Sequence, residues 1–330
     1  MRFRFHGMTL AVEGDPRAVA AAAELLGALP PDASPGVPDL RIVFRSSPPF
    51  PRPAGPRRFY HGILDCHADG DDLVLWDGHS IARVVAGGAL IEVHVADESM
   101  RDGYLFAHVF LLISLVTALR WRGLFHLHAG ALVAPDGRGI LVAGSAGAGK
   151  SSLTLALLEA GSYYLGDDAV FLSARGGDVA ALALPRPFHV APRTAEAFPR
   201  VGALLSDLLP TGEKRRLDPR LAWPGRERVS MSQPSLLLLP HVSGEATTVV
   251  EPLSSAEGMG ALIESSTFVV VDGLPGGAEH LDVLRRVADG VRALRVESGL
   301  DLLERPAETV DRLLRSAPGS SLIGHTKGEP

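Results

Sequence analysis

A glycine-rich motif, Gly144-Ser-Ala-Gly-Ala-Gly-Lys150-Ser151, most constrains the fold of this chain. It matches the pattern GxxxxGK[ST], in which a glycine-rich loop joins a strand to the N-terminus of a helix. The apolar run 140–143 predicts a buried strand before the loop, and residues 152–160 predict a helix that ends at Gly161. Backbone N–H groups and the positive end of the helix dipole then converge on one point, so the sequence predicts a phosphate-binding site.

The residues of this motif have separate expected roles. Lys150 is expected to reach the β- and γ-phosphates of a nucleotide, and the hydroxyl of Ser151 is expected to bind Mg²⁺. We therefore expect ATP and Mg²⁺ as cofactors. The residues expected to bind the nucleotide are Gly144, Ser145, Ala146, Gly147, Ala148, Gly149, Lys150, Ser151 and Ser152.

Composition narrows the class of protein. A chain of 330 residues with 46% hydrophobic content can bury a large core and is long enough for two domains. The net charge of −6 and the lack of a basic block argue against nucleic acid and anionic membrane as partners. The single cysteine, Cys66, excludes an intrachain disulfide, and the N-terminus lacks a signal peptide, so we expect a cytoplasmic protein. The apolar run 105–119 is short for a membrane span and predicts a buried helix.

The first part of the chain, residues 1–96, is predicted to be a β-rich α+β domain. An Ala/Leu-rich helix is expected at 16–29, and turns at Asp77-Gly78 and Gly87-Gly88 divide a meander of strands. His61, Asp65, Cys66 and His67 lie close together and are expected to form a polar turn, with a metal site as the alternative. The expected strands are 2–12, 40–44, 73–76, 80–85 and 89–95.

The second part, residues 97–316, is predicted to be a P-loop domain, followed by a disordered tail at 317–330. A long helix from Asp97 to about Arg122 leads into a β-hairpin that opens the phosphate loop. A mobile polar loop is expected at 210–228, and Ser254-Ser-Ala-Glu257 predicts a capping box. The other expected elements are strands at 169–172, 179–184 and 291–297 and helices at 194–209, 254–264 and 306–316.

The adjacent pair Asp167-Asp168 is the best candidate for the chemical step. It follows the P-loop helix by one short strand, which is expected to end beside the phosphates. Two neighbouring carboxylates stay ionised together only near a cation, which Lys150 and Mg²⁺ would supply. One carboxylate would deprotonate a hydroxyl while the other holds metal-bound water. The alternative is a solvated Gly-Asp-Asp turn.

Other side chains are candidates for a supporting role. His126 and His128 are spaced two apart, so in a strand they face the same way. Lys214, Arg215 and Arg216 would close over the nucleotide or form solvated surface, and Arg186 and Arg193 are weaker candidates of the same kind. A rival metal ligand is Asp272, which follows the apolar run 268–271.

Several of these segments together resemble a known family. They are His128-Ala-Gly-Ala-Leu-Val133, Asp136-Gly-Arg-Gly-Ile140, the P-loop and Leu165-Gly-Asp-Asp-Ala-Val170. The set resembles the catalytic core of HPr kinase/phosphorylase, and more closely the HPr-kinase-like proteins found with peptide-modification genes. The resemblance is specific over 124–190, weak but compatible to about 316, where Glu251-Pro-Leu-Ser-Ser255 and Ser298-Gly-Leu-Asp301 look like downstream segments of the family, and absent from the first hundred residues.

The resemblance implies an α/β fold with a PEPCK/HPr-kinase-like P-loop core, a mixed sheet with flanking helices. It implies phosphoryl transfer to a serine of a peptide or protein. By position, Asp167 resembles the general base, Asp168 its metal-side partner, and His128 the histidine near the transferred phosphate. Ala183-Leu-Pro-Arg-Pro-Phe188 stands where the family carries an EIRG(L/I)GI signature, so neither the phosphorylase reaction nor HPr as acceptor is expected.

The sequence thus predicts a serine kinase with Asp167, Asp168, His128 and Lys150 as catalytic residues and Ser151 and Asp168 at the metal. Its partner would be a peptide or protein that carries an acceptor serine, and a homo-oligomer is compatible with the sequence. Two alternatives stay open. One is a non-catalytic or slowly hydrolysing nucleotide switch that recruits a partner, and the other is a small-molecule kinase on the same fold.

Overall fold

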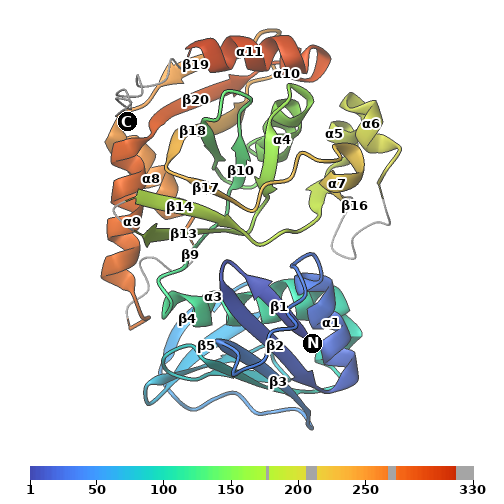
Figure 1. Ribbon diagram of the computed structural model, residues 1–330, viewed down its shortest axis with the longest axis vertical. Coiled ribbons are helices and arrows are strands. Elements are labelled where there is room, and N and C mark those ends of the chain that lie inside the picture. The colour runs from blue at the N-terminus through green and yellow to red at the C-terminus, as the bar shows by residue number, and fades with distance from the viewer. Residues whose placement is uncertain (176–177, 206–213, 267–272, 317–330) are drawn as a thin grey trace, which may run out of the picture.

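An eight-stranded sheet forms the N-terminal part of the computed structural model, which describes residues 1–175, 178–205, 214–266 and 273–316 (Figure 1). The strand order is β1-β2-β3-β8-β7-β6-β5-β4, with β3 parallel to both β2 and β8. The strands are β1 (Arg2–Phe5), β2 (Met8–Gly14), β3 (Leu40–Ser46), β4 (Arg57–His61), β5 (Leu64–Asp69), β6 (Asp72–Trp76), β7 (Ile81–Val84) and β8 (Leu90–Val95).

Two sequence predictions for this sheet were wrong. The strand expected at 2–12 is a hairpin, because His6 and Gly7 turn the chain with φ of 48° and 87°. The polar turn expected at His61–His67 is the end of β4 and most of β5, and the thiol of Cys66 is buried in the core. The predicted positions of β3, β6, β7 and β8 agree with the structure to within two residues.

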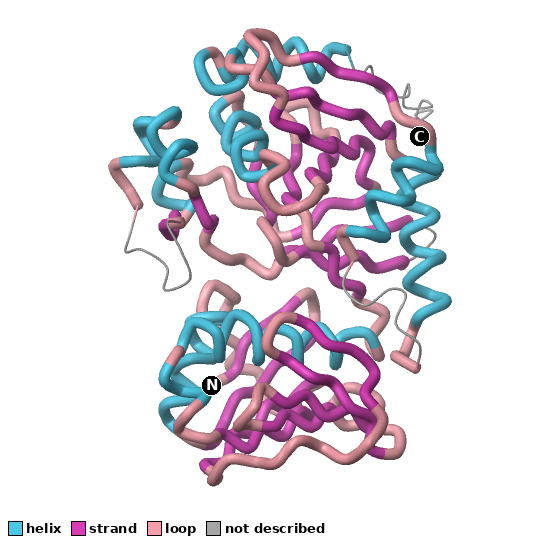
Figure 2. Tube along the Cα trace, turned by 180° about the vertical axis from the view of Figure 1, so that it is seen from behind, coloured by secondary structure: helices cyan, strands magenta, loops and turns pink. Residues whose placement is uncertain are grey.

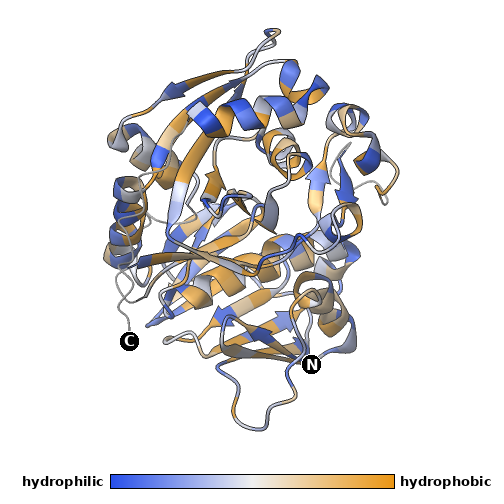
Figure 3. Ribbon diagram, turned by 45° about the horizontal axis from the view of Figure 1, so that its top comes forward, coloured by the Kyte–Doolittle hydropathy of each residue, from blue (hydrophilic) through white to orange (hydrophobic). Residues whose placement is uncertain are grey.

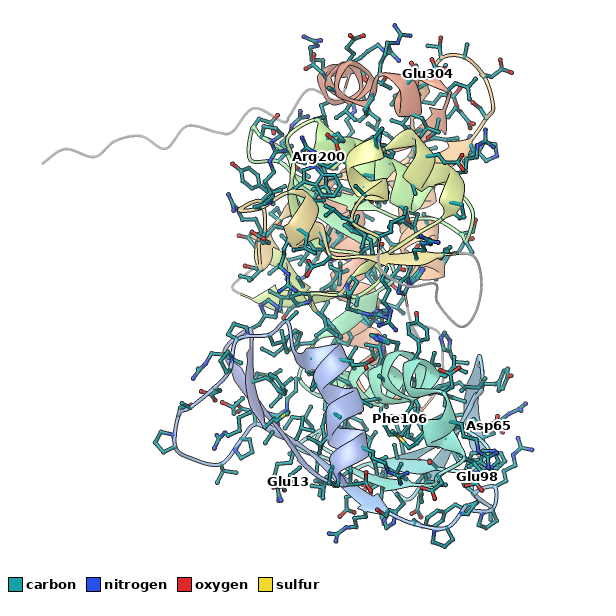
Figure 4. All side chains as sticks on the ribbon, turned by 90° about the vertical axis from the view of Figure 1, so that its right-hand side faces the viewer. Glu13, Asp65, Glu98, Phe106, Arg200 and Glu304 are labelled. Carbon is teal, nitrogen blue, oxygen red and sulfur yellow. The ribbon has the colours of Figure 1, made fainter. Side chains whose placement is uncertain are left out.

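Helices cover one face of this sheet. Helix α1 (Pro16–Leu26) begins at Asp15, whose carboxylate accepts from the first-turn N–H groups. The helix predicted from Asp97 has four parts: η1 (Ser99–Arg101), α2 (Gly103–Leu105), the π-helical η2 (Phe106–Leu111) and α3 (Leu112–Arg120). Figure 4 shows α1 beside the helix that carries Phe106.

The segment Gly103–Arg120 is long and apolar enough to cross a membrane, with a mean hydropathy of 1.7. However, 78% of this window is buried inside the protein. Most of its apolar residues between Phe106 and Leu119 belong to the same core as the first sheet, so the segment is a core helix, as predicted. The domain boundary expected at residue 97 stays a prediction. The packing of α3 in the first core favours a boundary after α3.

A six-stranded mixed sheet forms the centre of the second part. Its order is β12-β10-β11-β18-β20-β19, with β18 parallel to both β11 and β20. Figure 3 shows hydrophobic residues concentrated on the inner strands and hydrophilic ones on the outer sides of the helices. The strands are β10 (Gly130–Val133), β11 (Gly139–Val142), β12 (Tyr163–Gly166), β18 (Pro234–Val242), β19 (Val249–Pro252) and β20 (Arg292–Ser298).

Helices flank this sheet on both sides. One core joins the sheet to α4 (Lys150–Glu159), α10 (Asp301–Glu304) and α11 (Pro306–Ser316). The other joins it to α8 (Ser255–Glu264) and α9 (Gly277–Gly290). The capping box predicted at Ser254 and Glu257 is present. The protein is therefore a mixed α/β structure, as the sequence predicts at this coarse level.

A four-stranded sheet and a two-stranded one complete the second part. The four-stranded order is β17-β14-β13-β9. The helix expected at 194–209 is two short ones, because Pro199 starts a new helix, and 206–209 lie outside the described residues. The described part of the loop expected at 210–228 contains a strand and a helix. The elements are β9 (Phe125–Leu127), β13 (Val170–Arg175), β14 (Asp178–Ala183), β17 (Ser230–Ser232), β15 (Phe188–Val190), β16 (Arg215–Leu217), α5 (Pro192–Ala197), α6 (Pro199–Gly202) and α7 (Pro219–Ala222).

The two parts stack along the long axis, and α3 lies near their boundary (Figure 1 and Figure 2). The first core extends into the second part through residues of β13 and β14. The ring centroids of Phe5 and Phe171 lie 5.6 Å apart, and Nε2 of His6 lies 2.8 Å from the carbonyl oxygen of Ala183. The predicted tail, 317–330, lies outside the described residues.

Candidate functional site

The glycine-rich motif folds as its sequence predicts, between the end of β11 and the start of α4. Gly149 precedes the helix with φ of 100°, and a Cβ at this position would lie 3.1 Å from Cγ2 of Val242. Both conditions favour glycine. Nζ of Lys150 donates to the carbonyl oxygens of Gly144 at 2.8 Å and Ser145 at 3.3 Å, so the ammonium group lies over the loop. The first turn of α4 thus presents its N–H groups beside a buried cation.

A cavity of about 620 Å³ opens over this loop. Residues of the motif line it, except Gly144 and Ala148. The hydroxyl of Ser152 lies 3.1 Å from that of Thr194, which ties the start of α4 to α5. The cavity lining comprises His128, Ser145, Ala146, Gly147, Gly149, Lys150, Ser151, Ser152, Asp168, His189, Ala191, Arg193, Thr194, Lys214, Val242, Gly244, Ser298, Gly299, Leu300, Leu302 and Leu303.

Asp168 faces this cavity beside His128. Nε2 of His128 lies 3.3 Å from Oδ1 of Asp168, and Nε2 of His126 lies 3.0 Å from the carbonyl oxygen of Asp168. Asp168 has a φ of 60°, a conformation that few non-glycine residues adopt. Burial lowers the pKa of His128, and the charge of Asp168 partly opposes this. The carboxylate therefore lies next to a histidine that is largely neutral at pH 7.

Asp167 lies behind the cavity and does not line it. Its residue exposure is 3%, and among the described residues its Oδ1 has no hydrogen-bond partner. Burial raises the pKa of Asp167 well above the ordinary value, and the charge of Asp168 raises it further. A carboxyl group that does not line the cavity is not in direct contact with an acceptor bound there. The role of Asp167 as general base stays a prediction, and Asp168 is the carboxylate of the pair that lines the cavity.

The surroundings of Asp167 nevertheless fit a metal-bound water. A side chain at Gly130 would lie 2.8 Å from the hydroxyl of Thr154 and 3.8 Å from Oδ1 of Asp167, so glycine leaves both groups room. The hydroxyl of Thr154, on the P-loop helix, is also buried and has no hydrogen-bond partner in the part of the chain that the structure describes. Mg²⁺ keeps several waters and takes few protein ligands. Thr154 lies one turn after Ser151 on α4, so the two oxygens belong to the same region as the predicted metal ligand.

Basic side chains also line the cavity. His189, Arg193 and Lys214 line it, and burial followed by the charge of Arg186 lowers the pKa of His189 to about 4. Arg215 and Arg216 lie in β16, which pairs with β15. The cavity therefore has the charge expected for an anionic ligand such as a nucleoside triphosphate.

An apolar wall also lines the cavity, and sequence analysis did not assign it to the site. It consists of Val242, at the end of β18, and Leu300, Leu302 and Leu303 after β20. The buried carboxylate of Asp301 fixes this segment. It accepts from the N–H and hydroxyl of Thr248 at 2.8 and 2.6 Å, and Nη2 of Arg312 donates to it at 2.6 Å. The run Ser298-Gly-Leu-Asp301, which the family resemblance included, was the available signal.

The side chains of the alternative metal site in the N-terminal part have other partners. Asp65 is paired with Arg52 and Arg57, and Nδ1 of His67 donates to the carbonyl oxygen of Gly55. Among the described ranges, no group of three His, Cys, Asp or Glu side chains could hold a metal ion. The rival ligand Asp272 lies outside the described residues.

No protein-family model matches the chain, and no curated protein matches its sequence. Among solved structures, the HPr(Ser) kinase/phosphatase from Coxiella burnetii is similar at 15% identity, with a TM-score of 0.29. The similarity covers 58% of this chain and 93% of that one. Similarity at this level does not assign the chain to a family, so a function has to be argued from the site.

Proposed function

We propose that this protein is an ATP-dependent kinase that transfers the γ-phosphate to a serine hydroxyl of a peptide or protein. One observation carries the proposal: the P-loop and the Asp168–His128 pair line the same cavity. A phosphate-binding helix N-terminus and an accessible carboxylate are the two parts that a kinase needs. The choice of serine follows from the sequence resemblance to the HPr-kinase-like proteins, which also favours a PEPCK/HPr-kinase-like core.

In this proposal Asp168 accepts the proton of the acceptor hydroxyl, and His128 orients its carboxylate. The hydroxyl oxygen forms a bond to the γ-phosphorus, while the bond from that phosphorus to the β,γ-bridging oxygen breaks and its electron pair leaves with ADP. Lys150 and the N–H groups of α4 hold the phosphates during the step.

The cavity residues also define where Mg²⁺ would be held. The hydroxyl of Ser151 lines the cavity and would bind the metal directly, and Asp167 and Thr154 would hold its water molecules. When bound, Mg²⁺ would neutralise charge on the phosphates. Relative to the sequence prediction, the two carboxylates exchange roles.

Incubation with γ-labelled ATP, Mg²⁺ and the peptides encoded beside the gene tests this function. We expect label on a serine with the wild type and none with Lys150→Ala, which loses nucleotide affinity. ATP binding without any labelled acceptor or hydrolysis would contradict the kinase and favour the nucleotide switch. Label on a small molecule alone would contradict the peptide or protein acceptor.

A further inference from the structure

The helix that packs on the N-terminal sheet also contacts the edge of the cavity. Oη of Tyr104 lies 3.3 Å from Nε2 of His189, which lines the cavity. One helical turn later, the ring of His108 packs against that of Tyr104, with centroids 4.7 Å apart and an interplanar angle of 35°. His108 lies in the π-helical turn η2, a feature that often marks functional positions in helices. These side chains join the two parts of the chain beside the site.

Arg186 is the partner of His108 in the second part. Its Nη2 donates to Nδ1 of His108 at 3.2 Å. The backbone around Arg186 is attached to the turn that carries Asp167 and Asp168. The N–H of Leu184 donates to the carbonyl oxygen of Ala169 at 3.1 Å. The hydroxyl of Tyr164 donates to the backbone carbonyl oxygen of Arg186 at 2.9 Å. Arg186 is thus held next to the carboxylate pair from both ends of the turn.

Arg186 is a buried cation, with a residue exposure of 9%. Within the described residues it forms no ion pair, and its hydrogen-bonded side-chain partner is a histidine. Burial and the charge of Arg186 lower the pKa of His108 to about 3, so His108 is neutral and its Nδ1 is an acceptor. The same charge partly opposes the rise in the pKa of Asp167 and contributes to the lowered pKa of His128. Burying a cation is costly unless anions lie near it.

Building on the proposed kinase, we propose that Arg186 and His108 are positioning residues for phosphoryl transfer. Arg186 places a fixed positive charge beside the carboxylates Asp167 and Asp168, where negative charge gathers when the triphosphate binds. His108 sets the direction of the guanidinium group. The electrostatic field of the site is therefore assembled across both parts of the chain, and the N-terminal part contributes to the rate through its helix.

Substitutions on each side of this contact test the inference, with Mg²⁺·ATP hydrolysis and the binding of a fluorescent ATP analogue as readouts. We expect Arg186→Ala and His108→Leu to lower kcat by about tenfold or more while the analogue's Kd stays within about threefold of wild type. Arg186→Lys keeps the charge and His108→Asn keeps an acceptor, so each should recover part of the loss. A merely structural role would not produce this recovery with an unchanged Kd.

His6→Ala is the matched control, since it removes another histidine contact between the same two parts, that with Ala183. A loss in His108→Leu no larger than in His6→Ala, or a Kd that rises in step with the loss of kcat, would overturn the inference. If Arg186→Ala fails to fold, the inference is tested by comparing the kcat of His108→Leu with that of His108→Asn. A wild type without hydrolysis or transfer would refute the kinase as well, whereas turnover kept by every variant would refute this inference alone.

Discussion

Nε2 of His128 lies 3.3 Å from Oδ1 of Asp168 at the wall of the cavity, although the two residues come from different strand connections. His126 fixes the same aspartate from its other side, through the carbonyl oxygen of Asp168. The carboxylate is thus held in one orientation before any ligand binds. Such preorganisation is a main contribution of proteins to phosphoryl transfer.

We therefore expect Asp168→Asn to lower serine phosphorylation by at least about a hundredfold, because the amide cannot accept the hydroxyl proton. The Kd for ATP should change little, since Lys150 and the loop remain. Asp167→Asn is the matched variant, and its neutral side chain resembles the protonated form that burial favours. Label transfer at saturating ATP measures both. An Asp167→Asn protein that loses more activity than Asp168→Asn would contradict the exchanged roles.

Cys66 is predicted to be chemically inert in the folded protein. Its side chain is fully buried in the first core, and burial raises the pKa of the thiol to about 12. The reactive thiolate is therefore scarce at neutral pH and inaccessible. A thiol-specific dye should label none of the native protein and one thiol per chain in denaturant. Stoichiometric labelling without unfolding would contradict the position of β5.

Removal of the Asp301 carboxylate should destabilise the apolar wall of the cavity. Asp301 is 1% exposed and accepts hydrogen bonds from Thr248 and Arg312. We expect Asp301→Ala to lower the free energy of unfolding by about 2–4 kcal/mol, because the N–H and hydroxyl of Thr248 lose a buried charged partner.

Asp289→Ala is the control for this measurement. Asp289 pairs with Arg285 on the surface of α9, where both side chains are 58% exposed. An exposed pair of this kind contributes less than about 1 kcal/mol. Urea unfolding measures the free energy of unfolding of both variants. Equal decreases in this free energy would show that the hydrogen bonds of Asp301 do not stabilise the fold.

The sequence predicts local features of the site well. The P-loop follows from its motif because the strand, the turn and the helix N-terminus are contiguous in the chain. The motif does not predict which of the two carboxylates, Asp167 or Asp168, lines the cavity. Neighbouring residues in an extended chain point to opposite sides, and the φ of 60° at Asp168 determines which one faces the cavity.

Features that depend on distant contacts were missed. The contact of Arg186 with His108 joins segments far apart in the sequence, and neither residue belongs to a motif on its own. Strands β4 and β5 were also missed, because polar residues such as Asp65 and His67 interrupt the alternation that identifies a strand. Their partners, Arg57 and Gly55, supply the contacts that make burial of these side chains possible.

Stability should fall as the pH decreases below the ordinary pKa of histidine, 6.5. His108 and His280 are buried, and burial together with a neighbouring arginine lowers the pKa of each to about 3. Between these values the unfolded chain binds protons that the folded protein does not. Each histidine therefore reduces the free energy of unfolding by up to about 1.4 kcal/mol per pH unit as the pH falls. The slope falls to half of this value at pH 6.5 and vanishes well above it, where the unfolded histidines are also neutral.

Urea unfolding at a series of pH values between about 7 and 5 measures this slope. His108→Asn removes one titrating group but keeps an acceptor for Arg186, so its slope should be smaller than that of the wild type. The same change at His79, which is exposed, should leave the slope unaltered. If His108→Asn has the wild-type slope, His108 is protonated in the folded protein. Its Nδ1 could then not accept from Arg186, and the contact between the two parts of the chain would have to be different.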